Sequence, residues 1–113
     1  ALAQASGQLI LITEGPLDAI WLHENGFPAA ALLGLNMSHE HTVLLNGFAE
    51  VCIALDMDDA GMVAADSIKH RLLNSGRLMS QVTRLELPDG IKDVGEATPE
   101  ILEWAIKNRK AQV

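Results

Sequence analysis

The sequence has few of the features that mark secreted, membrane-bound or unfolded proteins. It contains a single cysteine in 113 residues, so no internal disulfide can form. No apolar run approaches the roughly 20 residues of a membrane-spanning helix, and we expect no signal peptide. Long polar tracts are also missing, because the apolar residues, 49% of the total, fall in spaced blocks. We therefore expect one compact domain over residues 1–113, located in the cytoplasm and without a membrane partner.

Positive charge is scarce. Eight lysines and arginines stand against 15 acidic residues, a formal net charge of -7. A domain that binds nucleic acid by itself normally carries a basic surplus, because neutralising phosphate charge dominates its affinity. Either this domain does not bind nucleic acid, or neighbouring domains provide the binding surface. The chain begins Ala-Leu-Ala-Gln without a methionine, and we interpret it as a piece of a longer protein.

Apolar blocks alternate with amphipathic stretches along the chain. This alternation predicts an α/β fold whose sheet is mostly parallel, with about four strands flanked by helices. The expected strands are Leu9–Thr13, Pro28–Leu33, Glu50–Leu55 and Ser80–Leu87. Helices are expected after Gly15-Pro16, from Ser38 to about Asn46, over about Asp58–Asn74 and after Thr98-Pro99, with a turn at Pro88-Asp89-Gly90. The third strand is apolar nearly throughout, which predicts a central position covered on both faces.

Two expected helices show apolar spacing. In the first, Leu17, Ile20, Trp21 and Glu24 fall on one stripe. In the third, apolar residues recur every four positions, with Val63 beside them: Ala60, Ala64, Ile68 and Leu72. Lys69-His70-Arg71 lies late in the third helix, where it complements the dipole; use as a strand-binding patch is the weaker alternative.

Three carboxylates directly follow buried strands. Glu14 ends the first expected strand, and Asp56 and Asp58 follow the third. The carboxyl ends of adjacent parallel strands meet at one rim, so these side chains are expected to converge. Asp56 and Asp58 are two residues apart and point to the same side of an extended backbone, where they can share one hard cation. Alternatively these acids only cap the third helix, the role we assign to Asp59.

These residues resemble the Toprim domain, which is shared by DNA primases, type IA and II topoisomerases and certain nucleases. The stretch Glu14–Ala19 resembles the EGxxD opening of primase Toprim domains, and Leu33-Gly34 resembles their second-strand LG. Asp56–Gly61 resembles DxDxAG, and Leu87–Asp93 resembles the LP…KD stretch of phage-type primase-helicases. The resemblance runs from about Leu9 to Glu96, with four motifs in order. It implies a compact, Rossmann-like Toprim fold.

The resemblance also implies metal-assisted phosphoryl transfer. Asp56, Asp58 and Asp93 would hold Mg²⁺ or Mn²⁺, and Glu14 would be either a general acid/base or a further ligand. Lys92 is either a phosphate or nucleotide contact or a solvated loop lysine. The implied partners are a single-stranded DNA template and nucleoside triphosphates, bound through a full-length protein that also carries or recruits a helicase. We expect the isolated piece to be inactive.

Three functions compete at this point. The first is the nucleotidyl-transfer domain of a DNA primase or primase-helicase, which makes RNA primers on single-stranded DNA. The second is a Toprim nuclease, repair or topoisomerase-related domain that cleaves phosphodiesters, and the third is a non-catalytic partner-binding module. The EGxxD, DxDxAG and LP…KD motifs favour the primase function. His39 and His41, at i and i+2 of an expected helix, do not face together and are not a metal site.

Overall fold

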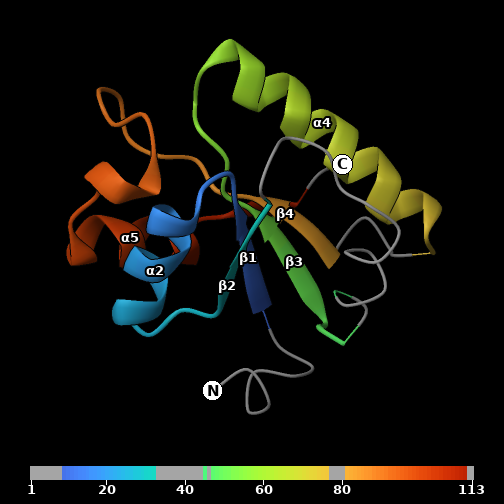
Figure 1. Cartoon of the computed structure of the whole chain (residues 1–113), viewed down its shortest axis with the longest axis horizontal. Helices are drawn as coiled ribbons and strands as arrows, with labels where there is room; N and C mark the ends of the chain where they lie inside the picture. The colour runs from blue at the N-terminus through green and yellow to red at the C-terminus, as the bar shows by residue number, and fades with distance from the viewer. Residues whose placement is uncertain (1–8, 33–44, 46, 77–80, 112–113) are drawn as a thin grey trace.

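The structure, a computed structural model, describes residues 9–32, 45, 47–76 and 81–111. Their strands form a five-stranded sheet in the order β2-β1-β3-β4-β5 (Figure 1). These strands are β1 (Leu9–Thr13), β2 (Ala29–Ala31), β3 (Glu50–Ile53), β4 (Val82–Arg84) and β5 (Lys110–Ala111). The first four run parallel, and β5 pairs antiparallel with β4 at the edge. The predicted α/β fold with a mostly parallel sheet is therefore confirmed.

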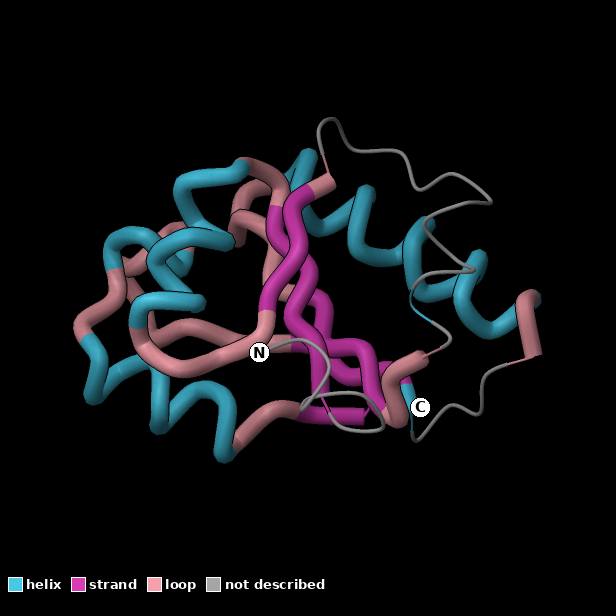
Figure 2. The backbone as a smooth tube through the Cα atoms, turned by 60° about the horizontal axis from the view of Figure 1, so that its bottom comes forward, coloured by secondary structure: helices cyan, strands magenta, loops and turns pink. Residues whose placement is uncertain are grey.

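Helices cover both faces of the sheet (Figures 1 and 2). Helix α4, Asp59–Asn74, lies on one face, and α2, Pro16–Glu24, and α5, Pro99–Lys107, lie on the other. A short 3-10 helix, η2, spans Val94–Glu96 before α5. Among the residues described, no helix combines the length and apolar character needed to cross a membrane.

The central strands divide their side chains between two apolar clusters. Successive residues of a strand point to opposite faces, so Ile10 and Ile12 pack on the α4 side while Leu11 packs on the α2 and α5 side. Both clusters are buried, which explains why β1 and β3 read as nearly continuous apolar runs. Cys52 on β3 is fully buried, and burial raises the pKa of its thiol to about 12.

Most predicted elements occur where the sequence placed them. Helices α2, α4 and α5 match three predicted helices, while β2 and β4 are shorter than the strands predicted around them. Neither η2 nor β5 was predicted, because elements of two or three residues leave no periodic pattern. The helix predicted from Ser38 lies outside the described residues apart from Leu45, as do Leu33-Gly34, His39 and His41.

Two of the three apolar residues in the predicted stripe of α2 face away from the core. Leu17 and Ile20 are 78% and 51% exposed, whereas Ala19 and Leu22 on the opposite side of the helix are buried. Trp21 is half-buried, and its indole N–H donates to the Ala97 carbonyl at 3.0 Å. Val63 on α4 is likewise 71% exposed rather than part of the core, and Ala60 is also exposed. The residues of α2 that are buried are a small residue, Ala19, and a single leucine, Leu22, and Trp21 packs beside them.

An ion pair ties the end of the chain to the start of β3. The Arg109 guanidinium donates from Nε to Glu50 Oε2 at 2.5 Å and from Nη2 to Oε1 at 2.8 Å. The Thr83 hydroxyl donates to the same carboxylate at 2.5 Å. Arg109 also donates to the Ile106 carbonyl at 2.7 Å, which places its positive charge at the carboxyl end of the last helix. The hydrogen bonds from Arg109 hold the pKa of Glu50 below its usual value of 4.5, against the opposing effect of burial.

Glu50→Gln should destabilise the domain by about 1–2 kcal/mol at pH 7, because the charged hydrogen bonds from Arg109 weaken. A depressed carboxyl pKa means that this stability is present above about pH 4.5 and is lost as the pH falls through the folded-state pKa. The difference between wild type and variant in urea melts should therefore shrink as the pH falls below about 4.5. The control is Glu86→Gln, which removes the exposed Lys110–Glu86 pair at 3.6 Å; an equal loss there would contradict a special role for Glu50.

Candidate active site

The predicted acids lie at the carboxyl ends of two adjacent strands. β1 and β3 are parallel neighbours, with Ile12 paired to Ile53, so Glu14 and Asp56 leave the sheet at the same rim. Burial and the charges of Asp56 and Asp58 raise the pKa of Glu14, while the Asp56 backbone amide beside its carboxylate lowers it. Glu14 and Asp56, 42 positions apart in the chain, are therefore neighbours at the rim.

Asp58 begins helix α4. Its backbone is extended, and its Oδ1 accepts a hydrogen bond from the Gly61 amide at 2.7 Å, which makes it the N-cap. Asp59, to which the sequence analysis assigned the cap, lies one position later in the first turn, where its charge still favours the start of the helix. One oxygen of Asp58 is therefore held by the helix, which fixes the direction of the carboxylate.

Gly61 is required by the close approach of α4 to the loop before it. A Cβ at this position would lie 2.1 Å from the Asp56 backbone oxygen and 3.1 Å from Asp58 Oδ1. No real side chain tolerates the first distance. Glycine is therefore required in the DxDxAG stretch for a steric reason: only a residue without a Cβ lets the helix start against the backbone of Asp56.

The segment around Asp93 is hydrogen-bonded to the loop that carries Asp56 and Asp58. The Met57 amide donates to the Lys92 carbonyl at 2.8 Å, which joins the DxD segment to the LP…KD segment. Asp93 is the N-cap of η2, with its Oδ1 accepting from the Glu96 amide at 3.1 Å. The Lys92 amide in turn donates to Glu96 Oε1 at 3.0 Å, while Lys92 itself is exposed.

Asp18 also belongs to this group, although its place in the EGxxD stretch was the only sign of it in the sequence. Burial and the charges of Asp93 and Asp56 raise the pKa of its carboxyl, while the nearby Gly95 amide lowers it. A Cβ on Gly95 would lie 2.8 Å from Asp18 Oδ1 and 3.2 Å from Asp93 Oδ1, so both carboxylates crowd this glycine. The EGxxD spacing was the available signal. Glu96 was also missed, and its charge acts on Asp56.

Burial and neighbouring acids raise the pKa of three carboxylates at the rim, those of Glu14, Asp18 and Asp56. We call Glu14, Asp18, Asp56, Asp58, Asp93 and Glu96 the acidic cluster. Burial is the largest cause of the raised pKa of Asp56, followed by the charges of Asp93, Asp58 and Glu96. Burial likewise comes first for Glu14 and Asp18, whose pKa values are also raised by neighbouring acids. Holding these groups ionised at neutral pH costs free energy, which a bound cation would recover.

The donor chemistry of the acidic cluster fits a hard divalent cation, because every side chain in it offers carboxylate oxygen. Within the described part of the chain, however, no three histidine, cysteine or acidic side chains converge closely enough to hold one ion together. Mg²⁺ retains several waters in most protein sites, so carboxylates spaced around it can act partly through water. The catalytic and ligand roles of Glu14, Asp56, Asp58 and Asp93 stay predictions.

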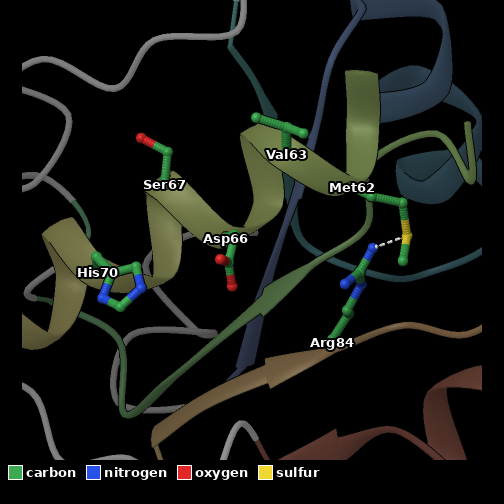
Figure 3. Close-up of a pocket in the computed structure, with 6 residues that line it drawn as sticks. All are labelled: Met62, Val63, Asp66, Ser67, His70 and Arg84. Atoms are coloured by element: carbon green, nitrogen blue, oxygen red, sulfur yellow. Dashed lines mark hydrogen bonds between the residues drawn. The ribbon is translucent and has the colours of Figure 1, made fainter. Parts of the chain in front are cut away.

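A pocket lies on the α4 face of the sheet, away from the acidic cluster. Its volume is about 510 Å³, and it is lined by Met62, Val63, Asp66, Ser67, His70 and Arg84 (Figure 3). The Arg84 guanidinium reaches from β4 and donates to the Met62 sulfur, and Asp66 pairs with Lys69 at 3.4 Å. The acidic cluster contributes no residue to this lining.

The Toprim-like family matches residues 11–98. This chain belongs to the Toprim-like family. DNA primase of Campylobacter jejuni is 35% identical to it over 89 residues, which are 77% of this chain and 14% of that protein. This Toprim-like domain therefore spans a small part of that relative.

Solved primase structures share the fold. The zinc-binding and RNA polymerase domains of Aquifex aeolicus primase superpose with a TM-score of 0.77 at 27% identity, over 92% of this chain and 26% of that one. The catalytic domain of DnaG primase bound to single-stranded DNA gives a TM-score of 0.76, over 97% of this chain and 36% of that one. At 24% identity this second likeness shows the fold alone.

Proposed function

We propose that this chain is the Toprim catalytic domain of a DNA primase or primase-helicase, a metal-dependent nucleotidyltransferase that makes RNA primers on single-stranded DNA. Primases are the relatives of this Toprim-like domain, which supports a primase-type domain. The observation that carries the catalytic part is the proximity of Glu14 and Asp56 at the rim, where burial and neighbouring acids raise the pKa of both.

In this proposal the acidic cluster binds Mg²⁺ or Mn²⁺. When bound, the cation would neutralise charge on phosphate oxygens and orient the attacking and leaving groups. Asp56, Asp58 and Asp93 would hold it, with Asp58 oriented by its hydrogen bond to Gly61 and Asp93 by its bond to Glu96. Glu14 would either accept the proton of the attacking hydroxyl or act as a further ligand; its raised pKa brings it closer to the range in which a general base works.

The template and the nucleotides would be held mainly by other parts of the longer protein. With a net charge of -7, the domain repels a polyanion unless cations intervene. Lys92 is the exposed cation nearest in sequence to the acidic cluster, and we propose it as a phosphate contact. A helicase domain or partner would complete the assembly, and the protein would work in the cytoplasm.

The test uses the natural protein that carries this chain in full. Incubated with a single-stranded template, ribonucleoside triphosphates and Mg²⁺, it should synthesise short RNA, and chelating the metal should abolish the product. A labelled duplex or single strand without nucleotides should stay intact under the same conditions. Metal-dependent cleavage without RNA synthesis would favour the nuclease alternative, and neither activity would favour a partner-binding module.

A further inference from the structure

Two exposed apolar surfaces lie on opposite faces of the sheet. The described residues include five exposed large apolar side chains, and four of them lie on α2 and α4: Leu17, Ile20, Met62 and Val63. Helix α2 packs on one face of the sheet and α4 on the other (Figure 1). Exposed apolar side chains that are grouped on one surface are a feature of interaction sites. Each surface is therefore a candidate contact with another macromolecule.

On α2, the exposed apolar residues share one side of the helix with a carboxylate. Leu17, Ile20 and Glu24 stand at positions i, i+3 and i+7, which places them on one stripe. All three are exposed, and Glu24 has no ion-pair partner among the described residues. We call these three residues the α2 stripe. It presents two apolar side chains followed by one negative charge, over about 10 Å of helix at 1.5 Å per residue.

On α4, the exposed apolar residues border a groove. This groove is the pocket of about 510 Å³ lined by Met62, Val63, Asp66, Ser67, His70 and Arg84, and we call it the α4 groove (Figure 3). From its first to its last residue on α4, it extends along about 12 Å of helix at 1.5 Å per residue. The groove and the α2 stripe are therefore similar in length.

Arg84 supplies the groove with a guanidinium that no carboxylate occupies. Val82 packs in the core on the α4 side, so Arg84, two residues later on β4, points to the same face. The guanidinium is half-buried and donates to the Met62 sulfur, which is a weak acceptor (Figure 3). It has no ion-pair partner in the described part of the chain, whereas Asp66 pairs with Lys69 at 3.4 Å. A carboxylate brought into the groove would accept a stronger, charge-assisted hydrogen bond from Arg84.

We propose that the α4 groove of one copy of this chain binds the α2 stripe of a second copy. The apolar residues of the stripe pack against Met62 and Val63, and Glu24 pairs with Arg84. The two surfaces are complementary, because apolar side chains meet apolar side chains and a carboxylate meets a guanidinium. A nucleic-acid strand fits the groove less well, since Asp66 lies in the lining and the chain has a net charge of -7.

The contact between copies is head-to-tail. Because stripe and groove lie on opposite faces of the sheet, each pair of copies leaves one stripe and one groove free. Association therefore continues beyond two copies. The surfaces are small beside the roughly 800 Å² per partner of a stable complex, so we expect a Kd on the order of 100 µM. Neither surface includes the acidic cluster, and the inference does not depend on the proposed function.

The test is analytical ultracentrifugation of the chain from about 10 µM to about 1 mM at physiological salt. The average mass of the wild type should rise with concentration and pass that of a dimer. Ile20→Glu places a charge in the stripe, and Arg84→Glu reverses the charge of the groove. Each should weaken association at least about tenfold.

A mixture of the two variants tests the head-to-tail geometry. Ile20→Glu keeps an intact groove, and Arg84→Glu keeps an intact stripe, so an equimolar mixture should form a dimer and nothing larger. Combining Glu24→Arg with Arg84→Glu in one chain reverses both charges of the proposed pair and should restore association. A mixture that stays monomeric, or a double variant that associates no better than Arg84→Glu, contradicts the proposal.

Two control variants match these substitutions. Lys107→Glu makes the same charge change as Arg84→Glu at an exposed position on α5. Trp104→Ala removes the fifth exposed large apolar side chain, also on α5. Neither should change association, and thermal melts of all variants establish that the fold persists.

Several results would overturn the inference. These are a wild-type chain that is monomeric at about 1 mM, or losses in the control variants equal to those in Ile20→Glu and Arg84→Glu. Methyl NMR of Met62 tests the other occupant of the groove. If a short single-stranded oligonucleotide shifts this resonance while the chain stays monomeric, the groove binds a strand and the proposed self-association is wrong.

Discussion

Asp56→Asn should weaken Mn²⁺ or Mg²⁺ binding by at least about tenfold while leaving the fold intact. Under the proposed function, primer synthesis by the protein that carries this chain in full should fall about a hundredfold or more, because a charge proposed to hold the metal at the reacting phosphates is lost. Burial and the neighbouring acids raise the pKa of Asp56, so the folded domain holds its charge at a cost in free energy. The asparagine removes that cost, and the metal-free variant should be at least as stable as wild type at pH 7.

The sign of the pH dependence follows from the raised pKa. Below the usual Asp value of 3.8 the carboxyl is protonated in both states, so wild type and variant should converge in stability. As the pH rises through the folded-state pKa, the wild type should lose stability relative to the variant. The control is Asp66→Asn, which removes the same charge from an exposed position on α4. Manganese-induced NMR broadening that is identical in Asp56→Asn and wild type would rule out Asp56 as a ligand.

Gly61→Ala should destabilise the domain by about 2–4 kcal/mol, a fall in melting temperature of roughly 10–20 °C. The added Cβ would meet the Asp56 carbonyl oxygen at 2.1 Å, a backbone atom that cannot rotate away. Relief requires the start of α4 to move from the DxD loop, so metal affinity should fall with stability. The gain in helix propensity, about 1 kcal/mol, is smaller than this steric cost.

Gly15→Ala is the matched control for that substitution. Gly15 also borders the acidic cluster, but a Cβ there meets nothing within 4 Å, and its φ of -111° is accessible to alanine. Differential scanning calorimetry should show this variant within a few degrees of wild type. A Gly61→Ala protein that melts at or above wild type would mean that α4 is free to shift, and the steric account of the DxDxAG glycine would be wrong.

Elements with a strong periodic or apolar signal were predictable. β1 and β3 are covered on both faces, so each reads as an unbroken apolar run bounded by polar residues. Thr98 caps α5 through a hydrogen bond to the Ile101 amide, and capping residues of this kind are visible in sequence. The buried face of α2 was not predictable, because Leu17 and Ile20 carry more apolar surface than Ala19 and yet face outward.

The candidate site was predictable only in part. Glu14, Asp56, Asp58 and Asp93 were predicted from their positions after strands and from the motifs that contain them. Acids grouped at such positions cost free energy, which points to a functional role. Asp18 and Glu96 were not assigned to it. Asp18 reads as an ordinary first-turn acid, and only the approach of η2 to α2, with the Gly95 amide against its carboxylate, brings it to the rim.

The sequence by itself determined the fold class, the order of the main elements and the chemical type of the site, because these depend on local patterns and on which residues follow each strand. The tertiary structure decided which carboxylates meet, that Asp58 rather than Asp59 caps α4, and that Arg109 pairs with Glu50. Those features depend on strand order and on loops that approach one another through space. No local pattern encodes such distances, since each is set by the packing of segments far apart in the chain.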